Sequence, residues 1–578
     1  MRLLLFLVSL LFSGAAFSGT SPKHEVRAVW LATIGGIDWP HSYYAASQRE
    51  ELRVMLDQLQ QAGINTVLFQ ARVRATTVYP SALEPWDGCV SGTPGRSPGY
   101  DPLQFCIEQC HQRGMECHAW VVTLPVGKWN ATGCQQLRKR YPGLIRHIGE
   151  DGYMDPEQWQ TADYLARVCR EIVHNYDVDG IHLDYIRYPE TWGKKAPATK
   201  AKPKKGNGRQ KATQRPAAPS QQQPSTTSAA QRRQNITAIV RKIHHAVKSL
   251  KPWVKLSCSP IGKSGDLSRY RSGGWNAYNA VYQDAQGWLR EGLMDQLYPM
   301  QYFRGNNYYP FALDWQERSC GRTIVSGLGI YFLSPREGNW PLQDVCRQMN
   351  FARENGIGHC YFRAKFLTDN TKGIYDFVRQ FDEAPALIPP MTWVWNQPPT
   401  APTRLDVDHG ATADHLSWSG AQNTSRASYL LYNVYASTQP QVDTSEPQNL
   451  VATRVMGSTL NIPHSTSRKL YYAVCATDRY GNESQPKQET GTPSQTAPNT
   501  NSAMTLVSDN RLLLPPKGAT LDADYLAIET LQGQLLMTVP FRGRYANICR
   551  LPDGVYRMRS IGRKGVSHGM GFFMVKRK

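Results

Sequence analysis

Long apolar runs are scarce in this chain. After residue 20, none is long enough to span a lipid bilayer, so we expect no membrane span. A glycine-rich phosphate loop is also missing after the first predicted strand, which disfavours a doubly wound nucleotide-binding sheet. No G-x-S-x-G elbow surrounds Ser257 or Ser259, so neither serine is a strong candidate for a triad nucleophile.

The cysteines do not follow a disulfide framework or a zinc motif. Most of the 12 cysteines lie within helical or strand patterns, where buried free thiols are the usual state. Cys89 and Cys134 fall in predicted loops and remain candidates for a disulfide. A further group has no zinc-site spacing: Cys106, Cys110, His111, Cys117 and His118. We therefore predict neither a metal nor a cofactor.

The first 20 residues have the pattern of a secretory signal peptide. Arg2 precedes an apolar stretch from Leu3 to Phe12, and the small residues Ala16 and Ser18 are suitably spaced for cleavage. No cysteine lies near that point, so a lipid anchor is not expected. We predict an exported protein, located in the periplasm, at the cell surface or outside the cell.

The net charge of +20 is concentrated in one segment. Between Lys194 and Arg215 there are nine lysines and arginines and no acidic residue. Residues 193–230 are also poor in large apolar side chains, so we predict a disordered insertion there. Because the charge is local and the protein is predicted to be exported, a nucleic-acid partner is not expected.

Strand and helix patterns alternate over residues 24–385. This alternation predicts an α/β fold, a (β/α)8 TIM barrel. The predicted strands are Arg27–Thr33, Ile64–Arg72, Glu116–Val122, Gly180–Ile186, Val254–Pro260, Gln296–Tyr302, Thr323–Tyr331 and Gly358–Lys365. The predicted helices between them are Ala46–Ala62, Asp101–Arg113, Pro156–Tyr176, Arg232–Leu250 and Pro341–Asn355.

The pattern of the remaining sequence predicts two small all-β sandwich domains. A proline-rich connection follows the barrel, and short alternating strands recur over residues 398–490. A linker rich in Ser, Thr, Asn and Pro then leads to a second β-rich domain at 503–578.

Polar, acidic and aromatic side chains gather at the predicted strand ends, where TIM barrels place their chemistry. Asp184 ends the fourth predicted strand and shares one face with His182 and Ile186. Arg187, three residues later, is placed to keep the Asp184 carboxylate ionised; the alternative is a structural ion pair. Flat aromatic rings and carboxylates suit a sugar substrate and glycosidic cleavage, which uses one acid and one base or nucleophile.

The second carboxylate is less clearly marked. We predict Glu84, in YPSALEPWDG, as the proton donor and Asp184 as the nucleophile or base; a solvated loop acid is the alternative for Glu84, and Glu190 and Glu337 are rivals. Asp179 and Asp295 lie at the opposite strand ends and are read as structural. The predicted substrate-binding residues are Asp38, Trp39, Arg72, Trp86, His118, Arg187, Tyr188, Gln301, Tyr302 and Tyr331; for His118 a core histidine is the alternative.

These residues lie in stretches that resemble the glycoside-hydrolase-like family ten of bacterial exported barrels. The matching stretches include EVRAVWLATIGGIDWP, NTVLFQARVRATTVYPSALEPWDG, DGIHLDYIRYP and YQDAQGWLREGLMDQLYPMQYF. The resemblance implies a hydrolase of bacterial glycans, including peptidoglycan strands stripped of peptide, with Asp184 as the catalytic carboxylate. It also implies that Asp38, Arg72, Glu84 and Gln301 line the site.

The chain departs from that family in two places. VVTLPVG stands where many members have an Asn-Pro-x-Arg run, and Tyr185 follows Asp184 where many members have a second aspartate. A non-catalytic glycan-binding barrel is therefore the alternative to an enzyme, and a surface adhesion protein is a weaker third interpretation. Residues 398–486 resemble a fibronectin type III domain, and the last domain resembles the C-terminal sorting domains of type IX secretion. The predicted partner is a glycan, anionic if the basic tract contacts it.

Overall fold

The computed structural model describes residues 21–192, 227–270, 274–463 and 469–489, together with strand segments between 505 and 575. The predicted signal peptide and residues 193–226 of the predicted insertion lie outside these ranges.

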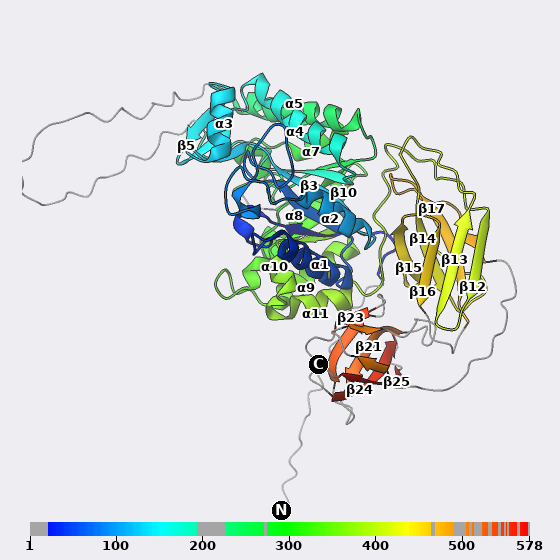
Figure 1. Cartoon of the computed structure of the whole chain (residues 1–578). Helices are drawn as coiled ribbons and strands as arrows, with labels where there is room; N and C mark the ends of the chain where they lie inside the picture. Colours follow the sequence, from blue (N-terminus) through cyan, green and yellow to red (C-terminus); the bar gives the residue numbers. More distant parts are fainter. Residues whose placement is uncertain are drawn as a thin grey trace, which may run out of the picture.

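Eight parallel strands close into a barrel surrounded by helices, which confirms the predicted fold class (Figure 1). Around the barrel the order is β1, β2, β3, β7, β8, β9, β10 and β11, so the strands follow one another in the sequence. Their bounds are β1 Arg27–Leu31, β2 Thr66–Arg72, β3 Glu116–Val122, β7 Gly180–Asp184, β8 Lys255–Cys258, β9 Gln296–Leu297, β10 Thr323–Leu328 and β11 Gly358–Tyr361.

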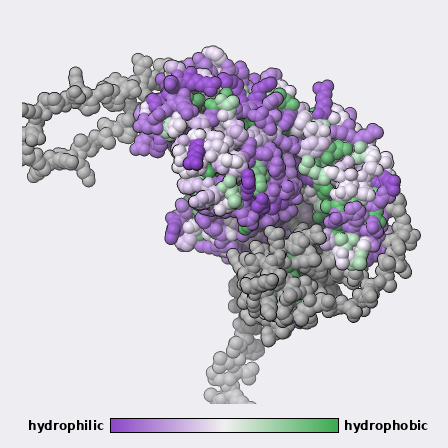
Figure 2. Space-filling model, in the orientation of Figure 1, coloured by the Kyte–Doolittle hydropathy of each residue, from purple (hydrophilic) through white to green (hydrophobic). Residues whose placement is uncertain are grey.

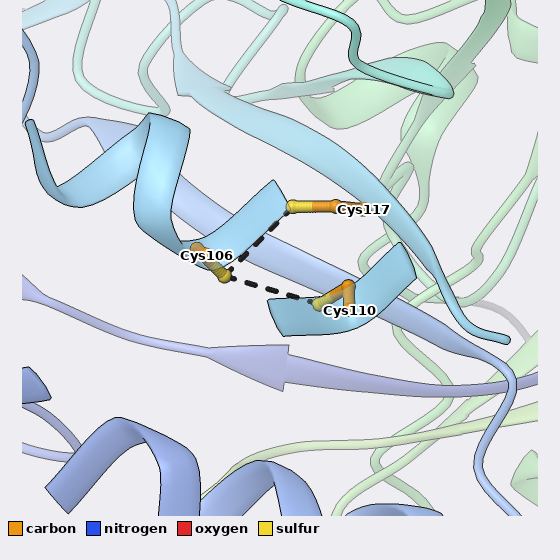
Figure 3. Close-up of side chains that lie close together, drawn as sticks. All are labelled: Cys106, Cys110 and Cys117. Carbon is orange, nitrogen blue, oxygen red and sulfur yellow. Dashed lines mark hydrogen bonds between the residues drawn. The ribbon is translucent and has the colours of Figure 1, made fainter. Parts of the chain in front are cut away.

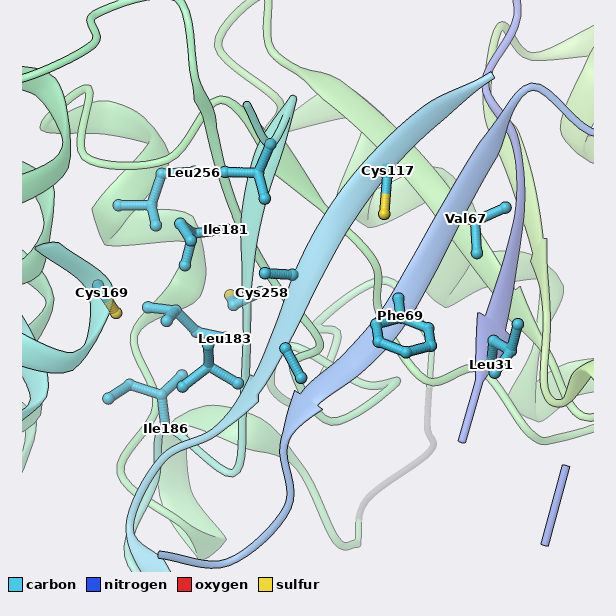
Figure 4. Packing of buried hydrophobic residues seen from close by; sticks show 14 of the residues in the cluster. Leu31, Val67, Phe69, Cys117, Cys169, Ile181, Leu183, Ile186, Leu256 and Cys258 are labelled. Carbon is cyan, nitrogen blue, oxygen red and sulfur yellow. The ribbon is translucent and has the colours of Figure 1, made fainter. Parts of the chain in front are cut away.

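Alternate residues of each barrel strand face opposite cores. Outward side chains such as Val67, Phe69 and Leu183 pack against the helices (Figure 4), whereas inward ones such as Trp30 and Trp120 fill the barrel. Both sides are buried, which explains why the strands read as near-continuous apolar runs.

The larger surrounding helices show the expected amphipathic spacing. In α1, Leu52, Leu56 and Leu59 form one buried stripe. The turn after α1 needs Gly63, because its φ is +77° and a Cβ there would lie 2.8 Å from the carbonyl oxygen of Asp382. The helix bounds are α1 Ala45–Gln61, α2 Pro102–His111, α3 Thr132–Arg140, α4 Trp159–Asn175, α5 Ala229–Lys248, α6 Ala277–Ala280, α7 Ala285–Arg290, α8 Tyr309–Glu317, α9 Leu342–Glu354, α10 Ala364–Thr368 and α11 Ile374–Phe381.

A small antiparallel sheet interrupts the regular alternation between β3 and α4. It consists of β4 (Pro125–Lys128), β6 (Asp151–Met154) and β5 (Ile145–Ile148), in that order, with α3 between β4 and β5. The sequence patterns described above do not predict this insertion. It lies in a loop after a barrel strand, on the side of the barrel where the strands end.

Two antiparallel sheets follow the barrel and share one core, so they form a β-sandwich. One sheet contains β12 (Arg404–His409), β13 (Ala413–Ser419) and β16 (Thr459–Pro463). The other contains β15 (Leu450–Val455), β14 (Leu431–Ser437), β17 (Tyr471–Thr477) and β18 (Lys487–Gln488). Leu416 and Trp418 from the first sheet meet Val434 and Tyr472 from the second.

A five-stranded and a two-stranded sheet make up the described part of the C-terminal unit. The first has the order β19 (Thr505–Val507), β25 (Ser567–Val575), β24 (Gly554–Gly562), β21 (Ala523–Glu529) and β22 (Leu535–Pro540). The second pairs β20 (Arg511–Leu513) with β23 (Tyr545–Asn547).

The described cysteines are all free thiols, including Cys89 and Cys134, so the structure does not form the disulfide that the sequence left open. Among the described residues, no helix combines the length and the apolar composition that crossing a bilayer requires. On the face shown in Figure 2 the barrel surface is largely hydrophilic, with hydrophobic residues in small groups.

Candidate active site

Asp184 is the last residue of β7, and its side chain lies on the inner side of the barrel wall where the strands end. The adjacent strand fixes the backbone at this point, because the Thr123 hydroxyl and amide both donate to the Asp184 carbonyl, at 2.7 and 2.9 Å. The side chain is 6% exposed. A carboxylate is therefore held rigidly at the C-terminal end of the barrel.

Three neutral groups donate hydrogen bonds to the Asp184 carboxylate. The Ser259 hydroxyl and the Tyr185 amide reach Oδ1 at 2.9 and 2.7 Å, and the Trp120 indole reaches Oδ2 at 3.2 Å. In the described part of the chain, its hydrogen bonds come from these donors and none comes from a lysine or arginine. Burial raises the pKa of Asp184 above its usual range, although the Arg187 charge and the hydrogen bonds favour the ionised form.

Arg187 and Tyr185 lie beside this carboxylate. The Arg187 guanidinium stacks over the Tyr185 ring, 4.4 Å from its centroid, and Tyr185 is 36% exposed. The buried Nη1 of Arg187 has no hydrogen-bond partner among the described residues. The described residues thus leave this buried donor unused.

Aromatic residues from three neighbouring loops pack together near Asp184. The Tyr302 ring stacks on Phe362 at 5.4 Å and meets the edge of Tyr331 at 5.7 Å. Burial raises the pKa of Tyr302 well above its usual range, with smaller contributions from Cys360 and Asp184. Next to Tyr302, the side-chain oxygen Oε1 of Gln301 accepts from the Ser326 hydroxyl at 2.9 Å. Nε2 of Gln301 has no partner in the described part of the chain.

Glu84 is held in a closed ion pair with Arg72. The guanidinium reaches Oε2 at 2.7 Å and Oε1 at 2.6 Å, and the Tyr164 hydroxyl donates to Oε1 at 3.0 Å. Both charged side chains are almost completely buried. Both carboxylate oxygens of Glu84 are therefore engaged by groups of the protein, which leaves neither oxygen free to reach a sugar.

Two other predicted substrate-binding residues, Asp38 and Trp39, make their contacts within the protein. Asp38 accepts from the amides of Ala32 and Lys365, at 2.8 and 3.1 Å, and pairs with the Arg363 side chain. Trp39 is fully buried in the core outside the barrel. Asp38 therefore ties the loop after β1 to the end of β11.

Tyr188 and Trp86 also pack into the protein. Tyr188 is fully buried in the core, and its hydroxyl accepts from Asn235 at 3.0 Å. Trp86 is half-buried against the same core. For Trp39 and Tyr188, complete burial excludes direct contact with a sugar in this conformation.

His118 lies deeper in the barrel than the candidate site. It is fully buried, its Nε2 is 2.9 Å from Glu116, and it pairs with Gly180, four residues before Asp184 in β7. A Cβ at Gly180 would lie 2.6 Å from the His118 ring, which explains the glycine there. This placement matches the alternative of a core histidine.

Trp120, Tyr185 and Ser259 contact the Asp184 carboxylate directly, and none of them is among the predicted catalytic or substrate-binding residues. Trp120 and Ser259 do lie at predicted strand ends, Trp120 within β3 and Ser259 one residue after β8. Strand order in a TIM barrel could have paired them with Asp184, since β3 and β8 flank β7.

Comparisons with known proteins agree with this architecture. The glycosyl hydrolase-like 10 family matches residues 25–325. The glycosyl hydrolase YngK of Bacillus subtilis is 27% identical over 519 residues, covering 84% of this chain and 98% of its own. The glycosyl hydrolase DigH of Escherichia coli K12 is 32% identical over 306 residues, covering 49% and 66%.

Among solved structures, the glycoside hydrolase domain of PgaB from Bordetella bronchiseptica aligns with a TM-score of 0.40 and 12% identity, over 62% of this chain and 99% of that domain. The family match spans the barrel from β1 into β10 and includes Asp184 with its three hydrogen-bond donors. This chain therefore belongs to the glycosyl hydrolase-like 10 family.

Proposed function

We propose that the protein hydrolyses glycosidic bonds in a bacterial glycan, with Asp184 as the proton donor. The observation that carries the proposal is a buried carboxylate at the barrel end that is held by neutral donors. Its raised pKa favours the protonated form, which a general acid needs. Oδ1 already accepts two hydrogen bonds, so Oδ2 is the oxygen from which a proton would reach the leaving sugar.

This assignment differs from the roles that the sequence suggested, because Asp184 becomes the proton donor and Glu84 has no catalytic role. Arg187 acts on Asp184 in the expected direction, but burial outweighs it. Glu84, expected to be the donor, is buried and both of its carboxylate oxygens are bound by Arg72. Glu190 and Glu337 are exposed side chains and lack the burial that raises the Asp184 pKa.

An anionic glycan suits the surroundings of Asp184. The Arg187 guanidinium lies over an exposed tyrosine ring and places a positive charge near Asp184, which suits a sugar that carries a carboxylate. The lactyl groups of peptide-free peptidoglycan strands are such carboxylates. We therefore propose these strands as the substrate of an exported enzyme.

A non-catalytic glycan-binding barrel is the second candidate function. It is favoured by the pairing of Glu84 with Arg72, because a paired-carboxylate mechanism needs a second carboxylate that is free to act. The two functions differ in whether the glycan is cleaved after it binds.

Purified peptide-free glycan strands, incubated with the protein and analysed by mass spectrometry, separate the two functions. We expect shortened products from the wild type and a loss of at least about 100-fold in rate for Asp184→Asn, since that amide cannot donate the proton. Glu190→Gln is the matched control and should keep its rate. Binding without products in the wild type would support the second function, and full turnover by Asp184→Asn would refute the role of Asp184.

A further inference from the structure

Three cysteines meet on the outside of the barrel wall. Cys106 and Cys110 lie one turn apart on α2, and Cys117 on β3 points at them from the strand below the helix (Figure 3). All three side chains are fully buried. Cys117 is near the start of β3, whereas Asp184 pairs with the end of that strand, so this cluster is separate from the candidate active site.

The spacing of the three sulfur atoms matches a trigonal metal site. Sγ of Cys106 is 4.0 Å from Sγ of Cys110 and 3.8 Å from Sγ of Cys117, and all three sulfurs lie within 4.8 Å of one another. A point equidistant from the three corners of such a triangle lies no more than about 2.5 Å from each sulfur, close to a metal–thiolate bond of about 2.3 Å. We propose that Cys106, Cys110 and Cys117 bind one soft monovalent metal ion, Cu(I).

The type and number of ligands favour this ion. Soft thiolates select Cu(I), Zn(II) and iron–sulfur clusters over hard cations. Structural zinc almost always takes four ligands, whereas the cluster in the described part of the chain supplies only three. Two histidines are adjacent to these cysteines in the sequence, but Nε2 of His111 contacts Asp179 at 2.8 Å, and His118 lies against Gly180 with its Nε2 2.9 Å from Glu116.

The cluster can take up the metal ion without a redox reaction. When Cu(I) binds, its oxidation state does not change, and each thiol that coordinates as a thiolate releases its proton to solvent.

Core thiols that do not form a metal site should differ from a metal site in their affinity for copper. Buried free cysteines otherwise behave as small apolar residues and show no preference for copper. The full chain, reduced and handled anaerobically, should therefore be titrated with Cu(I) in competition with the chelator bathocuproine disulfonate. We expect one equivalent to be retained, and X-ray absorption at the copper edge should show three sulfur neighbours at about 2.3 Å.

Serine variants locate the site. Cys106→Ser and Cys117→Ser should each weaken copper retention by at least about tenfold, whereas Cys169→Ser removes a buried thiol of α4 and should leave retention unchanged. The X-ray absorption of the wild type counts the sulfur ligands even if a variant fails to fold. Loss of all copper to the chelator, equal loss in Cys169→Ser, or a Cys106–Cys117 disulfide in the isolated protein would overturn the proposal.

Discussion

Asp184 shows how one residue combines a cost in stability with a use in chemistry. A buried carboxylate without an ion-pair partner disfavours its own ionisation, and the three donors only partly offset that cost. The proposed proton donor thus depends on a balance between burial and a few neutral hydrogen bonds. Changing one hydrogen bond should therefore shift its titration without removing the acid.

Replacement of Ser259 by alanine removes a donor to Oδ1 that favours the ionised carboxylate. A hydrogen bond to a charged group contributes roughly 1.5–3 kcal/mol, so losing it should raise the pKa of Asp184 further. A general acid loses activity as the pH rises through its pKa. The alkaline limb of kcat/KM should therefore move to higher pH in Ser259→Ala.

Ser257→Ala provides the control for that pH profile. The Ser257 hydroxyl lies 3.0 Å from His182 Nδ1 and is not among the donors to Asp184. Its removal should leave the alkaline limb where it is. A limb that stays fixed in Ser259→Ala, or moves to lower pH, would contradict the acid role of Asp184.

Glu84 illustrates a different balance, in which a buried charge is fully paired. Glu84→Gln would leave the Arg72 guanidinium buried without its counter-ion, and breaking a buried pair in this way costs roughly 3–5 kcal/mol. We expect the free energy of unfolding in urea to fall by about that amount. The turnover of molecules that remain folded should change little, because Glu84 stabilises the barrel wall in this interpretation.

The double variant Arg72→Met/Glu84→Leu tests the same ion pair by removing both charges. Replacing both charges by apolar groups of similar volume removes the uncompensated cation, so stability should recover relative to Glu84→Gln. If Glu84→Gln instead keeps its stability and loses turnover 100-fold, Glu84 is the proton donor that the sequence predicted.

At the scale of elements, the barrel could be predicted because its strands are short, apolar and separated by amphipathic helices. Each predicted strand overlaps a barrel strand. The sheet of β4, β5 and β6 was not predicted, because its strands have four residues each and mix exposed with buried positions. Such short strands give little periodicity to detect.

The end of β7 was predicted well in position and less well in geometry. Strand alternation places Ile186 on the face of Asp184, but Ile186 packs with Leu183 in the outer core (Figure 4). The reason is Tyr185, whose φ of 54° lies in the left-handed region and breaks the alternation. Likewise, the pairing of Glu84 with Arg72 depends on how the loop after β2 folds back onto the end of that strand, which residue types alone do not give.

The basic tract is a further element whose charge is predicted to affect substrate binding. It follows β7 in the sequence and carries nine lysines and arginines between Lys194 and Arg215. If it attracts an anionic glycan, deleting these residues should raise KM and flatten its dependence on salt, because exposed charges are screened. A variant of equal length with the nine basic residues replaced by glutamine should behave like the deletion, and a KM unchanged at all salt concentrations would contradict the role.

At the scale of the whole molecule, the β-sandwich is joined to the N-terminal end of the barrel by buried ion pairs. Arg454 contacts Asp179 at 2.5 Å and Glu116 at 3.1 Å. Arg479 contacts Asp179 at 3.1 Å and Asp177 at 2.8 Å. Asp179, which the sequence marked as a structural residue, thus bonds both Arg454 and Arg479, on the side of the barrel opposite Asp184.

These ion pairs make the joint between the two domains sensitive to acid. Burial alone would raise the pKa of Glu116, but Lys255, His118 and Arg454 lower it to about 2, and Arg454 and His111 hold the pKa of Asp179 well below its usual range. A carboxylate with a depressed folded-state pKa stabilises the fold above its unfolded pKa, near 4, and this contribution is lost as the pH falls through the folded value. We therefore expect the Tm to drop steeply between about pH 4 and pH 2.

Arg479→Ala tests this joint at neutral pH. The substitution leaves Asp179 and Asp177 without one of their cations, so the free energy of unfolding should fall by about 3 kcal/mol, and limited proteolysis should release the barrel from the sandwich sooner. Arg404→Ala is the matched control, because Arg404 is 72% exposed and its pair with Asp406 should contribute less than about 1 kcal/mol. Equal losses in Arg479→Ala and Arg404→Ala would show that the two domains are held together by other contacts.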